Sequence, residues 1–164
     1  MFEPHLQRPN MMAAIWRRMG VYLFEGHVTL EDMAQMEAYG VQWMKKNPGK
    51  MVEMVVIYPS DSYMTSEERT RMARVIKRWE ERRVASATVI LATDLMGSMH
   101  RSVLTGFQLI VRPPHPTKVF STTRDALAWL SPYIVEVCGV DATHPHMAAG
   151  VEALCARFQA RPGR

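Results

Sequence analysis

The chain alternates short apolar runs with capped amphipathic segments, and this order predicts a small α/β domain. Residues 51–58 form a nearly continuous apolar run, as expected for a central strand buried on both faces. Residues 84–93 predict a second such strand, and residues 117–120 a short one. The β-prone runs 14–19 and 21–26, separated by Gly20, predict a hairpin at the sheet edge.

Threonines placed before amphipathic segments predict where the helices begin. Thr29 precedes a helix that should end at Asn47-Pro48-Gly49, where proline cannot continue it. Thr65 with Glu68 three residues later forms a capping box for a second helix. Further helices are expected over residues 95–111 and after Thr122 or Thr123.

The last amphipathic segment follows a break at Gly139 and at His144-Pro145-His146. Its apolar positions recur at helical spacing, so it should bury one face, either in its own core, which we favour, or against a second copy of the chain. These positions are Met147, Val151, Leu154, Cys155 and Phe158. We predict an N-terminal extension at 1–13, one domain over 14–137 and a C-terminal helical extension at 138–164.

Composition fits one globular domain and excludes several classes of protein. The 164 residues are 48% hydrophobic and 22% charged, which is enough for a core without disulfides or metal. Cys138 and Cys155 have no metal-ligand spacing, so reduced thiols in a cytoplasm are expected. We expect a cytoplasmic protein, since no segment resembles a signal peptide or a membrane span. The net charge of +4 is mild, and we expect no nucleic-acid partner.

The sequence contains none of the common catalytic, metal-binding or phosphate-binding motifs. No Gly-rich phosphate loop, G-x-S-x-G elbow, H-E-x-x-H or Cys-x-x-Cys is present, so we expect neither an enzyme nor a metal site or cofactor. His144 and His146 are close in sequence, but Pro145 between them prevents the helical pairing of many metal sites. A solvated loop is the favoured interpretation of this pair.

Residues 86–93 and 116–130, together with 55–58 followed by 66–69, resemble the small bacterial STAS and SpoIIAA-like proteins. The resemblance covers roughly residues 14 to 135. It implies a four- to five-stranded mixed sheet with helices packed on it, and a non-enzymatic switch that binds a protein partner. Some members are phosphorylated on a serine in an Asp-Ser-x-Gly-like motif after the central strand. Here Asp61-Ser62 is followed by Tyr63-Met64 in place of small residues, which disfavours a phosphoswitch.

Three sets of residues are candidate sites, and each has a structural alternative. Hydroxyls at a helix N-terminus could accept or bind a phosphate, although helix capping explains them as well; they are Ser62, Thr65 and Ser66. An arginine stripe could dock an acidic protein or anionic head groups, or be an ordinary solvated face; it comprises Arg71, Arg74, Arg78 and Arg82. An apolar stripe could line a ligand pocket or an interface, or fill the core; it comprises Met96, Met99, Val103 and Phe107.

These observations predict a regulatory or scaffolding module of the bacterial cytoplasm that binds a protein partner, a second copy of itself included. The alternative is a carrier for lipid or another small apolar ligand, of the STAS/SEC14-like type.

Overall fold

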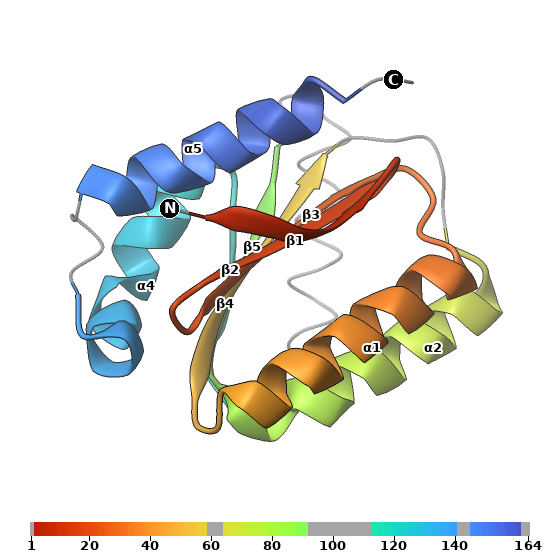
Figure 1. Cartoon of the computed structure of the whole chain (residues 1–164), viewed down its shortest axis with the longest axis horizontal. Helices are drawn as coiled ribbons and strands as arrows, with labels where there is room; N and C mark the ends of the chain where they lie inside the picture. The colour runs from red at the N-terminus through yellow and green to blue at the C-terminus, as the bar shows by residue number, and fades with distance from the viewer. Residues whose placement is uncertain (1, 59–63, 92–112, 141–144, 162–164) are drawn as a thin grey trace.

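A six-stranded mixed sheet is the centre of the fold (Figure 1). The computed structural model describes residues 2–58, 64–91, 113–140 and 145–161. The strands follow one another across the sheet in chain order, from β1 to β6. They are β1 (Glu3–Arg8), β2 (Met11–Trp16), β3 (Met19–Glu25), β4 (Met51–Tyr58), β5 (Arg83–Ile90) and β6 (Thr117–Phe120). The first two pairings are antiparallel, and β3 to β6 run parallel.

Helices cover both faces of the sheet, as Figure 1 shows. The described helices are α1 (Leu30–Lys46), α2 (Ser66–Trp79), the short 3-10 helix η1 (Glu80–Arg82), α4 (Thr123–Cys138) and α5 (Pro145–Gln159). Helices α1 and α2 lie side by side on one face, and α4 and α5 lie on the other. The chain therefore folds as an α/β/α sandwich, the usual way to bury both faces of a largely parallel sheet.

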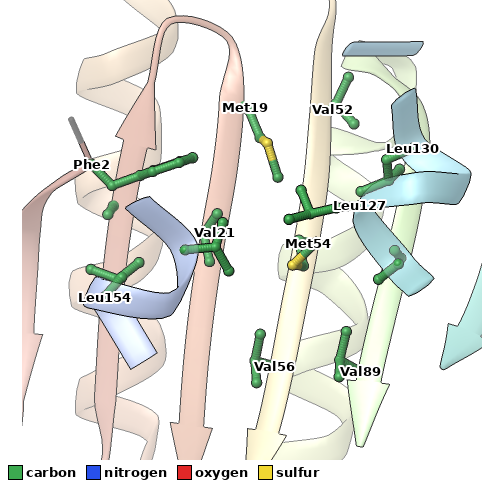
Figure 2. Packing of buried hydrophobic residues seen from close by; sticks show 14 of the residues in the cluster. Phe2, Met19, Val21, Val52, Met54, Val56, Val89, Leu127, Leu130 and Leu154 are labelled. Carbon is green, nitrogen blue, oxygen red and sulfur yellow. The ribbon is translucent and has the colours of Figure 1, made fainter. Parts of the chain in front are cut away.

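The larger core lies between the sheet and helices α4 and α5. Alternate residues of β4 point into it, Val52, Met54 and Val56 among them, since side chains alternate between the faces of a strand (Figure 2). Leu127 and Leu130 of α4 belong to the same core and lie beside β4 in Figure 2. Met147, Val151, Leu154 and Phe158 of α5 are also buried there. The prediction that the last helix buries its apolar face in its own core is therefore confirmed.

The smaller core lies under α1 and α2 and depends on Trp79. This indole packs with Met11, Met36 and Val75. A Cβ added at Gly40 of α1 would lie 2.3 Å from the Cη2 atom of Trp79, so α1 approaches the ring more closely than a side chain allows. Gly40 is thus kept in mid-helix by packing, because glycine there otherwise costs about 1 kcal/mol relative to alanine.

Three of the predicted helix starts are confirmed by hydrogen bonds at their caps. Thr29 and Thr65 both form complete capping boxes, with Asp32 and Glu68 respectively. Thr122 accepts a hydrogen bond from the backbone N–H of Asp125 and so begins α4. The loop Asn47-Pro48-Gly49 ends α1 as expected.

The N-terminal region differs from the prediction. The sheet has six strands where four or five were expected, because residues 3–8 form β1 and pair with β2. Residues 3–8 and 11–13 of the expected N-terminal extension therefore belong to the sheet. Pro4 and the irregular register beside it are typical of an edge strand, which lacks a strong apolar signal. The hairpin also turns earlier than predicted, at Arg17, whose φ is 52°, and Gly20 lies inside β3. The expected helix over 95–111 lies outside the described residues.

Candidate functional site

The N-terminus of α2 already holds an anionic group of its own. The Glu68 backbone N–H donates to Thr65 Oγ1 at 3.2 Å, and the Thr65 N–H donates to the Glu68 carboxylate at 2.7 Å. His27 Nε2 lies 2.6 Å from the same carboxylate. The hydrogen bond from the Thr65 N–H lowers the pKa of Glu68, with a further contribution from His27. At the start of α2, the Thr65 N–H therefore binds the Glu68 carboxylate, at the helix end where a phosphate was one of the two expected ligands.

The other hydroxyls of this candidate set have different surroundings. Ser66 is exposed, and its Oγ accepts a hydrogen bond from Arg69 at 3.0 Å. Arg69 also donates to the Met64 carbonyl at 2.7 Å, so it is held across the first turn of α2. Ser62 lies outside the described residues. The structure therefore brings Thr65 and Ser66 to one helix start, with Thr65 acting as the cap.

The arginine stripe is divided by its contacts. Arg71 and Arg78 both pair with Glu37 of α1, so one carboxylate holds two guanidinium groups across the α1–α2 contact. Arg74 lies between them along the helix, is exposed, and has no ion pair among the described residues. Arg82 leaves the stripe, because it lies in η1 and its Nη1 is 3.5 Å from the Gly49 carbonyl oxygen. Two of the four side chains are thus fixed within the fold.

The exposed surface of α2 carries an apolar side chain, Ile76, as well as the cations Arg74 and Lys77. Ile76 is 47% exposed, and Lys77, which follows it, is exposed as well. At 100° per residue, Lys77 lies between Arg74 and Ile76 on the helix surface. Lys77 and Ile76 were not among the predicted site residues, because Ile76 fits the spacing of the buried stripe.

Charged groups at the edge of the sheet where β1, β3 and β4 end are paired with one another. Arg8 Nε lies 3.1 Å from Asp32 Oδ1, and Arg161 Nη2 lies 3.1 Å from Glu25 Oε2. The Arg161 guanidinium also stacks 3.2 Å from the centre of the Phe158 ring. Burial raises the pKa of Asp32, but hydrogen bonds from Asn10, Thr29 and Arg8 outweigh it and hold that pKa below its usual value. These contacts join loops to helix ends and are structural.

A buried ion pair lies under α2 and was not predicted. Arg83 Nη2 is 2.9 Å from Glu53 Oε2, and both side chains are at least nine-tenths buried. Ser86 donates to Glu53 Oε1 at 3.2 Å, and Arg83 Nη1 donates to the Ile76 carbonyl at 2.9 Å. Burial and the nearby Arg83 lower the pKa of His115. The one sequence signal was Glu53 inside the apolar run 51–58.

The described residues contain neither a metal site nor a membrane-spanning helix. Within residues 2–58, 64–91, 113–140 and 145–161, no three His, Cys, Asp or Glu side chains are placed to hold a metal ion. In the same ranges, no helix is long and apolar enough to cross a membrane. The apolar candidates Met96, Met99, Val103 and Phe107 lie outside the described residues.

Comparison with known proteins identifies the fold. The chain superimposes on the crystal structure of an uncharacterised protein of the DUF3478 family, with a SpoIIAA-like fold, from Shewanella loihica PV-4, with a TM-score of 0.57. The match covers 74% of this chain and 94% of that protein, at 18% sequence identity.

The chain has a SpoIIAA-like fold. No family model matches the sequence, and no curated protein matches it. The predicted resemblance is therefore confirmed for the fold, and the SpoIIAA-like architecture accounts for the mixed sheet with helices on both faces.

Proposed function

We propose that this SpoIIAA-like domain is a non-enzymatic regulatory or scaffolding module that binds an acidic protein partner in the bacterial cytoplasm. The observation that carries the proposal is the outer face of α2, where exposed Lys77 lies between exposed Arg74 and exposed Ile76. Protein interfaces combine exposed apolar side chains with charged ones, and arginine is enriched in them. Arginine forks also bind carboxylates bidentately, which favours an acidic partner.

Arg71 and Arg78, which pair with Glu37, give further support to a binding surface on α2. Because Glu37 holds Arg71 and Arg78, these two side chains cannot turn freely toward a partner, and they form a rigid border beside Arg74. A pre-positioned border lowers the entropy lost on binding. The surface is therefore defined as Arg74, Ile76 and Lys77, and we refer to it as the α2 face.

The paired ionisable groups elsewhere favour binding over catalysis. Glu53 is matched to Arg83, Glu68 to the α2 cap and His27, and Asp32 to the α1 cap. A catalytic acid or base needs a free position next to its substrate, whereas these groups hold elements of the fold together. This is the support for a non-enzymatic role.

The test is a comparison of two double charge reversals in the bacterium that encodes the protein. Arg74→Glu/Lys77→Glu changes the α2 face without touching Glu37. Lys118→Glu/Arg124→Glu is the matched control, because it makes the same change in charge at exposed residues of β6 and α4. A partner recovered with the wild type should also be recovered with the control, and it should be lost with Arg74→Glu/Lys77→Glu. Binding measured between the purified protein and the purified partner should likewise be weakened in Arg74→Glu/Lys77→Glu and unchanged in the control.

Two outcomes contradict the proposal. A partner that binds the α2 variant as tightly as the wild type would remove this face. Extra mass in a native mass spectrum that disappears on denaturation would support the carrier alternative, with a lipid or small apolar ligand bound.

A further inference from the structure

Three segments rich in cations meet at the amino-terminal edge of the parallel strands. They are the β2–β3 turn, the end of α1 with the loop into β4, and η1, which lie at one end of the sheet in Figure 1. The Val52 N–H donates to the Arg18 carbonyl at 3.0 Å, and Lys50 Nζ donates to the Glu81 carbonyl at 2.7 Å. These contacts hold the three segments together, and Arg18, Lys50 and Arg82 lie around Gly49. We call this surface the Gly49 edge.

Gly49 allows the cations to converge. Its φ is +116°, a conformation that favours glycine, and a Cβ there would lie 2.1 Å from Arg18 Nη1. The Arg18 guanidinium therefore lies directly against the bare backbone of Gly49. A concavity of about 270 Å³ opens beside it, lined by Gly49, Lys50, Glu81 and Arg82. This is smaller than the roughly 300–1,000 Å³ of a pocket for a drug-sized ligand, so it suits a small charged group.

The charge of this edge is not balanced within the described chain. The cationic side chains of the three segments are Arg17, Arg18, Lys45, Lys46, Lys50 and Arg82, and none has an ion pair among the described residues. Arg17 donates instead to the Cys138 carbonyl at the end of α4, at 2.7 Å. The same segments carry two carboxylates, Glu80 and Glu81, which leaves an excess as large as the +4 of the whole protein. By contrast, Arg8, Arg71, Arg78 and Arg161 each face a carboxylate.

We propose that the Gly49 edge binds a phosphate group, with Arg18, Lys50 and Arg82 as its ligands. A phosphate monoester carries about −1.5 to −2 charges at neutral pH, so it compensates clustered cations better than one carboxylate does. The exposed large hydrophobic residues of the described chain are Leu30, Ile76 and Val135, and none of them lies in these segments. The edge therefore has the chemistry of a phosphate site without an apolar anchor for insertion into a bilayer.

The test is a titration of the ¹⁵N-labelled full chain with inorganic pyrophosphate, followed through backbone amide shifts. The expected result is saturable shifts centred on Gly49, Lys50 and Arg82. Lys50→Gln/Arg82→Gln should weaken binding by about tenfold or more, because it removes two charge-assisted hydrogen bonds. Arg74→Gln/Lys77→Gln loses the same charge on the α2 face and should change the affinity by less than about twofold, because neither side chain lines the concavity.

Each result decides the proposal. The absence of saturable shifts, or equal weakening by the two variants, would overturn it, since the second result would show a bulk charge effect. A lipid source is examined with phosphatidylcholine vesicles with and without phosphatidic acid. Binding of the wild type only to the anionic vesicles, lost in Lys50→Gln/Arg82→Gln, would identify a head-group phosphate as the ligand. The proposed function depends on the α2 face, whereas the phosphate site depends on the Gly49 edge. Loss of the protein partner in Arg74→Glu/Lys77→Glu and loss of pyrophosphate binding in Lys50→Gln/Arg82→Gln are therefore independent results.

Both substituted side chains lie outside the core, so the double variant should fold. Lys50 is exposed and Arg82 half-buried. A thermal melt matching that of the wild type confirms this. Were the double variant to unfold early, Lys50→Gln alone would still be expected to lower the affinity for pyrophosphate, and an unchanged affinity would count against the site.

Discussion

Replacing Glu53 with methionine should destabilise the fold severely, because it leaves the Arg83 charge buried without its carboxylate. The pair is separated by 2.9 Å, and at an effective dielectric constant of about 20 such a contact is worth about 6 kcal/mol before desolvation is subtracted. Desolvation costs several kcal/mol per ion, so the intact pair is close to neutral against an apolar replacement. Removing one partner, however, typically costs about 3–5 kcal/mol.

The assay is urea unfolding of a double-mutant cycle. Glu53→Met and Arg83→Met should each lower the midpoint by roughly 1.5–2.5 M, taking an m value of about 2 kcal/mol per M. The double variant should be more stable than either single variant, because it buries no unpaired charge. Glu152→Met on the exposed side of α5 is the control and should change stability by less than about 0.5 kcal/mol. A double variant destabilised by the sum of the two single effects would refute this reasoning.

Three further predictions concern other parts of the molecule. Gly40→Ala should destabilise the fold by about 1 kcal/mol by urea unfolding, since overpacking against Trp79 outweighs the gain in helix propensity; stabilisation would contradict the close approach. Burial raises the pKa of Asp32, but hydrogen bonds lower it further. The contribution of the Asp32 carboxylate to stability is therefore complete above the unfolded pKa of about 3.9 and is lost as the pH falls through the folded pKa. The difference in unfolding free energy between wild type and Asp32→Asn should shrink below about pH 4. Burial raises the pKa of both Cys138 and Cys155, so iodoacetamide should label them slowly at pH 7.5 and quickly in urea; fast labelling of the folded protein would show an exposed thiolate.

Local signals in the sequence were sufficient for most elements of the fold. The capping boxes at Thr29 and Thr65 depend on residues three positions apart, and the run 51–58 is apolar throughout because both faces of β4 are covered. Strand β1 was missed for the converse reason. It is an edge strand in which exposed and half-buried residues alternate, so its formation depends on pairing with β2 and not on its own composition.

The candidate sites depended on tertiary contacts that periodicity does not contain. Nothing along α1 indicates that Glu37 holds both Arg71 and Arg78, and this contact divides the predicted stripe. The start of η1 after Trp79 moves Arg82 away from the helix surface that an unbroken α-helix would give it. The convergence at Gly49 joins residues 18, 50 and 82, which are far apart in the sequence, and so required the parallel register of the strands.

The distribution of paired and unpaired charges separates structural from functional roles in this molecule. At the carboxyl ends of the strands, Arg8 and Arg161 each neutralise a carboxylate and join a loop to a helix, so their charges are explained by stability. At the Gly49 edge, clustered cations repel one another, which is unfavourable for folding unless an anion is bound. Selection for stability alone would pair or remove them, as at the other end of the sheet. Among the described residues, cations without an ion pair gather at the Gly49 edge and on the α2 face, and this is why both proposals of binding are placed there.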